Sequence, residues 1–203
     1  MGMNGENEMV PEANEAARQA ARQAIARHVM TLFDGMPKAR PFTRDARELA
    51  VLSVADAPDE AVVSYSTAGL CEVALDTGGF DTRIELCGAM PDDVEHWPEI
   101  LAAAAFELAA AASPVRPGVV VRDVVARFYP KTTVPHLYLS IPFIWNDGDF
   151  PECRVDDTRV NWLQCFPVSD DEARLAGELG ADGFESRLDE ADIDTYDLRR
   201  KSL

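Results

Sequence analysis

Apolar residues recur every three to four positions between Glu12 and Asp34, the spacing that places them on one face of an α-helix. Gly35 follows as a helix-ending residue, and Pro37 stands where a helix can no longer continue. The pattern predicts a long amphipathic helix over residues 12–34, preceded by a flexible polar lead over residues 1–11. The apolar stripe consists of Ala13, Ala16, Ala17, Ala20, Ala21, Ala24, Ile25, Val29, Leu32 and Phe33.

Short apolar runs of strand length occupy the middle of the chain. Residues 70–75 and 83–87 flank Gly78 and Gly79, which predicts a hairpin, because glycine readily adopts the positive φ that a chain reversal needs. A helix is expected from Pro98 to about Ala112, with proline in the first turn and a stripe of leucine and alanine. The remaining runs predict strands over residues 48–55, 62–67, 119–129 and 136–145.

Residues 158–203 carry the clearest local signals. Apolar residues occupy both alternating faces of the run 158–167, which predicts a central strand. Ser169 and Glu172 have the spacing of a capping box, so a helix is expected to begin at Asp170. Gly180 is expected to end this helix, and a second helix follows it.

Several motifs follow one another in a fixed order over residues 62–203. They are STAGL at 66–70, RIEL at 83–86, WPEILAAAAFEL at 97–108, Phe166-Pro167, Glu172, Gly180-Ala181-Asp182, Leu188 and Arg200-Lys201-Ser202. This order resembles the Suppressor of fused (SUFU) domain family, in which a strand ending in proline leads to an acid-capped helix, Gly-Ala-Asp, a second helix and Arg-Lys-Ser. The chain departs from the family where many members carry Gly-His-Thr, because it has Pro117-Gly118-Val119-Val120-Val121 there. A role tied to that histidine therefore does not carry over.

The resemblance implies a single SUFU-like domain over residues 12–203 with an α+β (mixed α/β) fold, in which a central mixed β-sheet is flanked by helices. The alternation of predicted strands and helices leads to the same fold class. The resemblance also implies a function in protein binding. Bacterial members look like immunity proteins that neutralise a secreted toxin, and animal members hold a short peptide of a transcription factor as an added strand.

The charge balance narrows the choice of partner. The net charge is −17, which repels phosphate backbones and favours a basic protein over nucleic acid, with solubility as the alternative explanation. The basic residues of the cluster Lys38, Arg40, Arg44 and Arg47 are expected to pair with the acidic surface of the protein itself or with its last acidic helix. The sequence contains neither a secretory signal nor an apolar run of about 18 residues, so we expect a cytoplasmic protein without membrane contact.

An acidic segment with embedded aromatic residues lies before the last predicted strand and is the candidate partner-binding site. Loops on a rigid scaffold commonly carry binding, and large aromatic residues serve as interface anchors. A calcium loop is one alternative, although the glycine and glutamate spacing of an EF-hand is absent, and a solvated turn is another. The candidate residues are Trp145, Asp147, Asp149, Phe150, Glu152, Asp156 and Asp157.

The sequence shows no motif for a metal, a nucleotide or an activated nucleophile, so we expect no cofactor and no metal. The four cysteines lack C-x-x-C spacing, which favours reduced, buried thiols, with a Cys71–Cys87 disulfide as a minor alternative. A non-catalytic protein-binding module is therefore the main hypothesis. The alternative is an enzyme whose site is dispersed in sequence, for example over Cys165, His136 and Asp147.

Overall fold

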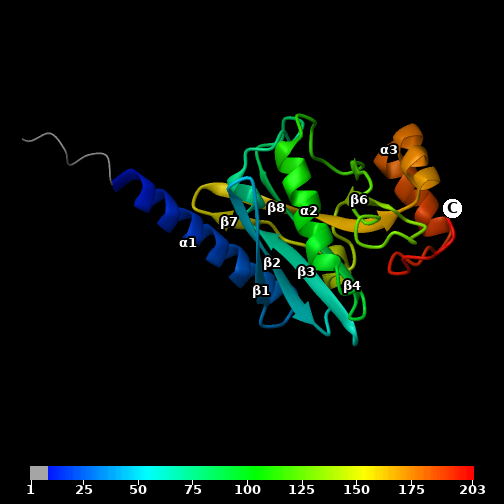
Figure 1. Cartoon of the computed structure of the whole chain (residues 1–203), viewed down its shortest axis with the longest axis horizontal. Helices are drawn as coiled ribbons and strands as arrows, with labels where there is room; N and C mark the ends of the chain where they lie inside the picture. Colours follow the sequence, from blue (N-terminus) through cyan, green and yellow to red (C-terminus); the bar gives the residue numbers. More distant parts are fainter. Residues whose placement is uncertain (1–8) are drawn as a thin grey trace, which may run out of the picture.

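The computed structural model describes residues 9–203, apart from the side chains of residues 9–14 and of Asp147, and its sheet is organised around the longest strand, β8 (Figure 1). The chain runs through α1 (Met9–Leu32), β1 (Lys38–Arg44), β2 (Arg47–Ala55), β3 (Val62–Ala68), the 3-10 turn η1 (Leu70–Glu72), β4 (Arg83–Pro91), α2 (Trp97–Ala110), β5 (Val120–Val121), β6 (His136–Ser140), the 3-10 turn η2 (Asn146–Gly148), β7 (Cys153–Val155), β8 (Thr158–Val168) and α3 (Asp170–Glu190).

The eight strands form one mixed sheet. Its order is β1-β2-β3-β4-β8-β6-β5, and β7 pairs with the first residues of β8. The β4–β8 pair is parallel, with Arg83 opposite Val160, whereas all other neighbours are antiparallel. The predicted fold class, a mixed sheet flanked by helices, is confirmed.

Helices cover both faces of the sheet. Strand β8 is therefore buried on both sides, which explains why its sequence is apolar at nearly every position. Successive side chains of a strand point to opposite faces. Leu163 and Cys165 belong to the core beneath α2, whereas Trp162 packs in the core beneath α1 and Phe166 in the core beneath α3. Figure 1 shows α1 and α3 near opposite ends of the molecule, with α2 crossing the sheet between them.

The first helix begins at Met9, and only its C-terminal part packs on the sheet. Ile25 and Val29 are fully buried, but all side chains from Glu15 to Ala20 are exposed. Figure 1 shows the reason, since α1 continues past the margin of the sheet. The predicted stripe is therefore an inner face only from Ala21 onward.

The predicted hairpin over residues 70–87 is wrong. Residues 70–75 do not form a hairpin with 83–87, because Leu70–Glu72 is a 3-10 turn and β4 pairs with β3 and β8. The fully buried carboxylate of Glu85 fixes this turn by accepting hydrogen bonds from the backbone amides of Gly69 at 2.8 Å and Cys71 at 3.1 Å. The hairpin contact proposed for a Cys71–Cys87 disulfide is therefore absent, and all four cysteines are free and buried.

The predicted strand over 119–129 is reduced to Val120–Val121, and the predicted strand over 136–145 ends at Ser140. Asp123 has a positive φ of 58°, and its amide donates to Nδ1 of His136 at 2.9 Å, which turns the chain out of the sheet. Pro142, two residues beyond Ser140, has no amide hydrogen to continue the ladder of β6.

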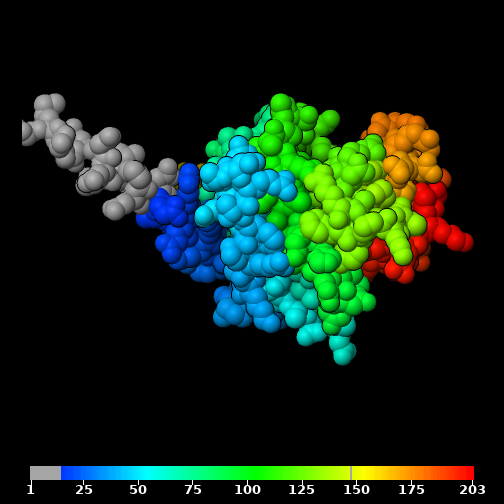
Figure 2. All heavy atoms as spheres, viewed as in Figure 1, coloured from blue at the N-terminus to red at the C-terminus, as the bar shows by residue number. Residues whose placement is uncertain are grey.

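The C-terminal segment follows its local signals. Ser169 and Glu172 form both bonds of the predicted capping box at the start of α3, and Gly180 interrupts the helix with a φ of 73°. The tail then returns along α3, as the red segment in Figure 2 shows, and Arg200 pairs with the buried Glu172. Glu172 and Arg200, two residues of the predicted C-terminal motif, are thus in direct contact.

Candidate functional site

The candidate segment, residues 145–157, is held on the sheet by Trp145. The indole is 2% exposed, and its Nε1 donates to Oγ of the buried Ser64 at 2.8 Å. It also stacks on Phe33 with the ring centroids 5.1 Å apart. This corrects the expectation for Trp145, because a buried indole supports the segment from beneath and does not present itself to a partner.

Phe150 is half-buried and extends the same aromatic cluster. Its ring centroid lies 5.4 Å from that of Trp145 and 5.6 Å from that of Trp162. His28 stacks on Trp162 at 5.0 Å, and its Nε2 lies 2.9 Å from the carbonyl oxygen of Pro151. His28 is thus a packing residue, and it ties α1 to the candidate segment.

The acidic residues of the segment remain at the surface. Asp149, Glu152, Asp156 and Asp157 are all exposed, and Glu152 forms only a long ion pair with Arg154 at 3.7 Å. Asp147 lies in η2, and its side chain is outside the described part of the structure. A solvent-accessible row of acids therefore follows the aromatic cluster along the chain.

The exposed apolar residues of this region were not among the predicted candidates. Ile141 is 64% exposed and Phe143 is 49% exposed. The backbone amide of Phe143 donates to the buried side chain of Gln164 at 2.9 Å, which fixes the turn that carries both residues. The sequence signal was Pro142, because a proline within a strand-like run marks an edge or the end of the strand.

A groove of about 590 Å³ separates this turn from the second half of α3. Glu185 lies in its wall, and the hydroxyls of Tyr138 and Ser140 donate to its Oε1 at 3.0 and 2.9 Å. Burial, and then the Glu185 carboxylate, raise the pKa of the Tyr138 phenol, so this hydroxyl stays protonated as a donor. Asp189 and Asp192 line the same groove.

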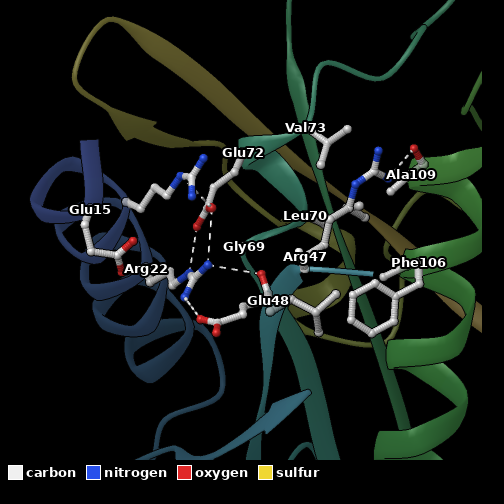
Figure 3. A pocket seen from close by; sticks show the side chains of 14 residues that line it. Glu15, Arg22, Arg47, Glu48, Gly69, Leu70, Glu72, Val73, Phe106 and Ala109 are labelled. Atoms are coloured by element: carbon white, nitrogen blue, oxygen red, sulfur yellow. Dashed lines mark hydrogen bonds and ion pairs between the residues drawn. The ribbon is translucent and has the colours of Figure 1, made fainter. Parts of the chain in front are cut away.

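A second cavity, of about 430 Å³, lies between α1, the β1–β2 hairpin and the end of α2 (Figure 3). Arg22 holds Glu72 through two bonds of 2.6 and 3.2 Å, and Arg47 donates to the carbonyl oxygen of Ala109 at 2.7 Å. Burial opposes the charge of Arg22, but Glu72 outweighs it and raises the pKa of the guanidinium. These charges are already paired with each other, and the pair of Arg22 with Glu72 holds α1 on the sheet.

The basic cluster of the sequence lies on and beside β1. Arg40 pairs with Glu99 of α2 at 2.7 Å, and the guanidinium of Arg44 lies over the ring of Phe106 at 5.2 Å. The expected pairing with the acidic surface is therefore seen for Arg40, whereas Arg44 packs on an aromatic ring of the same helix.

The structure separates the residues named for a dispersed catalytic site. Cys165 packs in the core beneath α2, whereas His136 lies on the other face and contacts Asp170 of α3 at 3.0 Å. Burial also raises the pKa of the Cys165 thiol, which disfavours the nucleophilic thiolate. Within the described residues no three His, Cys, Asp or Glu side chains are grouped as metal ligands would be.

Comparison with known proteins identifies the family of this chain. Residues 45–201 match the model of the Suppressor of fused protein (SUFU) family. The chain belongs to the SUFU family. It is 30% identical over 185 residues to the immunity protein YqcF of Bacillus subtilis (strain 168), covering 89% of this chain and 96% of that protein.

Solved SUFU structures share the fold. A SUFU homologue from Neisseria gonorrhoeae FA 1090 superposes with a TM-score of 0.64 at 19% identity, covering 91% of this chain and 97% of that chain. Drosophila Suppressor of Fused gives a TM-score of 0.65 at 14% identity, covering 90% of this chain but 51% of that chain. None of the helices in residues 9–203 has the length and apolar character needed to cross a membrane.

Proposed function

We propose that this SUFU-family protein binds a basic protein and masks it, as an immunity protein masks its toxin, and that it does so without catalysing a reaction. The 30% identity to immunity protein YqcF over nearly the whole of both chains carries this proposal. The net charge of −17 and the exposed acids of the candidate segment support a basic partner.

In this proposal the exposed acids Asp149, Glu152, Asp156 and Asp157, together with Asp147, steer the partner toward the segment. Charge acts mainly on the association rate, and a desolvated apolar contact sets the dissociation rate. Trp145 contributes indirectly, because its bond to Ser64 holds the segment in place. Phe150, which is half-buried, offers part of its ring to the partner.

The test uses the protein encoded next to this gene as the candidate partner, with stopped-flow association measured at low and high salt. Changing Asp156 and Asp157 to asparagine should slow association several-fold and flatten its salt dependence, because two steering charges are lost. The control changes Asp59 to Asn and Glu60 to Gln. This is also an exposed acidic pair in a turn, but it lies at the opposite end of the sheet.

An association rate that is insensitive to salt and equal in both variants would contradict the electrostatic part of the proposal. Turnover of a small molecule by the protein alone would contradict the non-catalytic part. Protection of cells from the neighbouring protein, lost on deletion of this gene, would support the immunity role.

A further inference from the structure

The groove between the Ile141–Phe143 turn and α3 carries charges of a single sign, whereas the cavity at Arg22 and the pockets lined by Lys131 and by Arg159 combine both signs. Glu185, Asp189 and Asp192 line it, and neither lysine nor arginine does. Their spacing places them along one side of α3 and the residues that follow it. None of the three carboxylates forms an ion pair within residues 15–203.

The opposite wall and the floor of the groove are apolar. Ile141 and Phe143 stand at its edge with 64% and 49% of their surface exposed. Phe166, Leu188 and Ile193 continue the apolar lining inward. The volume of about 590 Å³ lies within the range of roughly 300–1,000 Å³ of pockets that enclose a ligand.

Glu185 is positioned to receive a cation. Two hydroxyls donate to its Oε1, whereas Oε2 has no hydrogen-bond partner in the described structure. A guanidinium fits this arrangement better than an ammonium, since its planar fork of N–H donors matches a carboxylate and is more weakly hydrated beside an apolar wall.

We infer that this groove binds an arginine-bearing segment of a protein partner, with the guanidinium on Glu185 and a neighbouring apolar side chain against Ile141 and Phe143. The inference rests on the proposed function only in taking a protein as the occupant. It assigns a site beside the acidic segment, and it makes the arginine the feature that the site recognises.

The probe is a library of random peptides displayed on phage and selected on the whole protein. Enriched peptides are expected to carry an arginine next to an aliphatic or aromatic residue. Resynthesised peptides are then measured by fluorescence polarisation. Glu185→Gln and Ile141→Ser should each weaken binding by about ten-fold or more, the loss expected of one charge-assisted hydrogen bond or one apolar anchor.

Two controls match these variants in chemistry. Glu178→Gln removes an exposed acid of α3 outside the groove, and Met36→Ser removes a side chain that is 79% exposed and distant in sequence from the turn. Both should stay within about two-fold of the parent. Glutamine at position 185 retains an oxygen for the hydroxyls of Tyr138 and Ser140, so an unchanged melting temperature will show that the fold is intact.

Enriched peptides without arginine, or an affinity unchanged by Glu185→Gln, overturn the inference. So does a selection that yields no more binders than one on the Glu185→Gln/Ile141→Ser double variant. If a partner associates in a salt-sensitive manner but binds both variants, Glu185→Gln and Ile141→Ser, as tightly as the parent, the groove is not the binding site. The proposed function would then still hold. Failure of the proposed function shows separately, in a rate insensitive to salt and to Asp156 and Asp157.

Discussion

Replacing Arg200 with leucine would leave a buried carboxylate without its cation. Glu172 is fully buried and Arg200 is 7% exposed. Nη2 of Arg200 donates to Glu172 at 2.7 Å and to the carbonyl oxygen of Pro167 at 3.0 Å, and Nη1 donates to the other carboxylate oxygen of Glu172. The pair therefore ties the end of the chain to the start of α3 and the end of β8.

Removing one partner of a buried ion pair costs about 3–5 kcal/mol. We expect the lower end, near 3 kcal/mol, because the amides of Ser169 and Leu203 still donate to Glu172 at 2.9 and 3.1 Å. With a urea m-value of about 2–3 kcal/mol per molar for a chain of this size, the unfolding midpoint should fall by about 1–1.5 M. Arg199→Leu is the control, since this exposed neighbour forms no ion pair in the described structure and should change the unfolding free energy by less than about 0.5 kcal/mol.

The pH dependence gives a second, independent readout. Burial by itself would raise the pKa of Glu172, but the hydrogen bonds and charge of Arg200 outweigh it and lower the pKa. In the parent protein this stabilisation is present above the unfolded pKa of about 4.3 and is lost as pH falls through the lower folded value. In Arg200→Leu burial dominates and the folded pKa rises, so stability is lost as pH rises through it.

The stability difference between the two proteins should therefore shrink between pH 7 and pH 5, measured by urea unfolding at each pH. A difference below about 1 kcal/mol at pH 7, the value of an exposed pair, would refute this reasoning. A difference that does not change with pH would refute the assignment to Glu172.

Four further predictions concern the fold and the expected independence of its stability from metal. Ser169→Ala should lower the unfolding free energy by about 1 kcal/mol, measured by thermal melting, because the N-cap oxygen is lost; a loss well below that would mean that Ser202 or water replaces the cap. Truncation after Gly180 should abolish the cooperative transition seen by circular dichroism, since it removes the buried Phe184 and Arg200, whereas protease should cut the whole chain only before about residue 12. Chelator should leave the melting temperature unchanged, and stoichiometric zinc in protein purified without added metal would contradict this.

The features that could be predicted from sequence depend on residues a few positions apart. The capping box of Ser169 and Glu172 and the interruption at Gly180 are set within single turns, and both are found. The central position of β8 was also legible, because a strand covered on both faces has little room for polar residues.

The errors arose where a partner distant in sequence decides the conformation. Residues 70–72 form a turn because Glu85 accepts from their amides, although their composition suits a strand. Trp145 is buried and its indole reaches Ser64, so its place in an acidic segment did not make it the interface anchor that was predicted. The groove at Glu185 lies between the end of β6 and α3, and the sequence of neither element alone predicts it.

The parallel pairing of β4 with β8 has a consequence for synthesis. Strands β1 to β4 form a meander of neighbours in sequence and can pair as soon as they are made. Their second edge remains open until Val160 arrives opposite Arg83, and long-range parallel pairing is slow because a large loop must close first. From the completion of β4 at Pro91 until β8 begins at Thr158, the nascent chain thus exposes an unpaired β4 edge, to which a chaperone or a second nascent chain could bind.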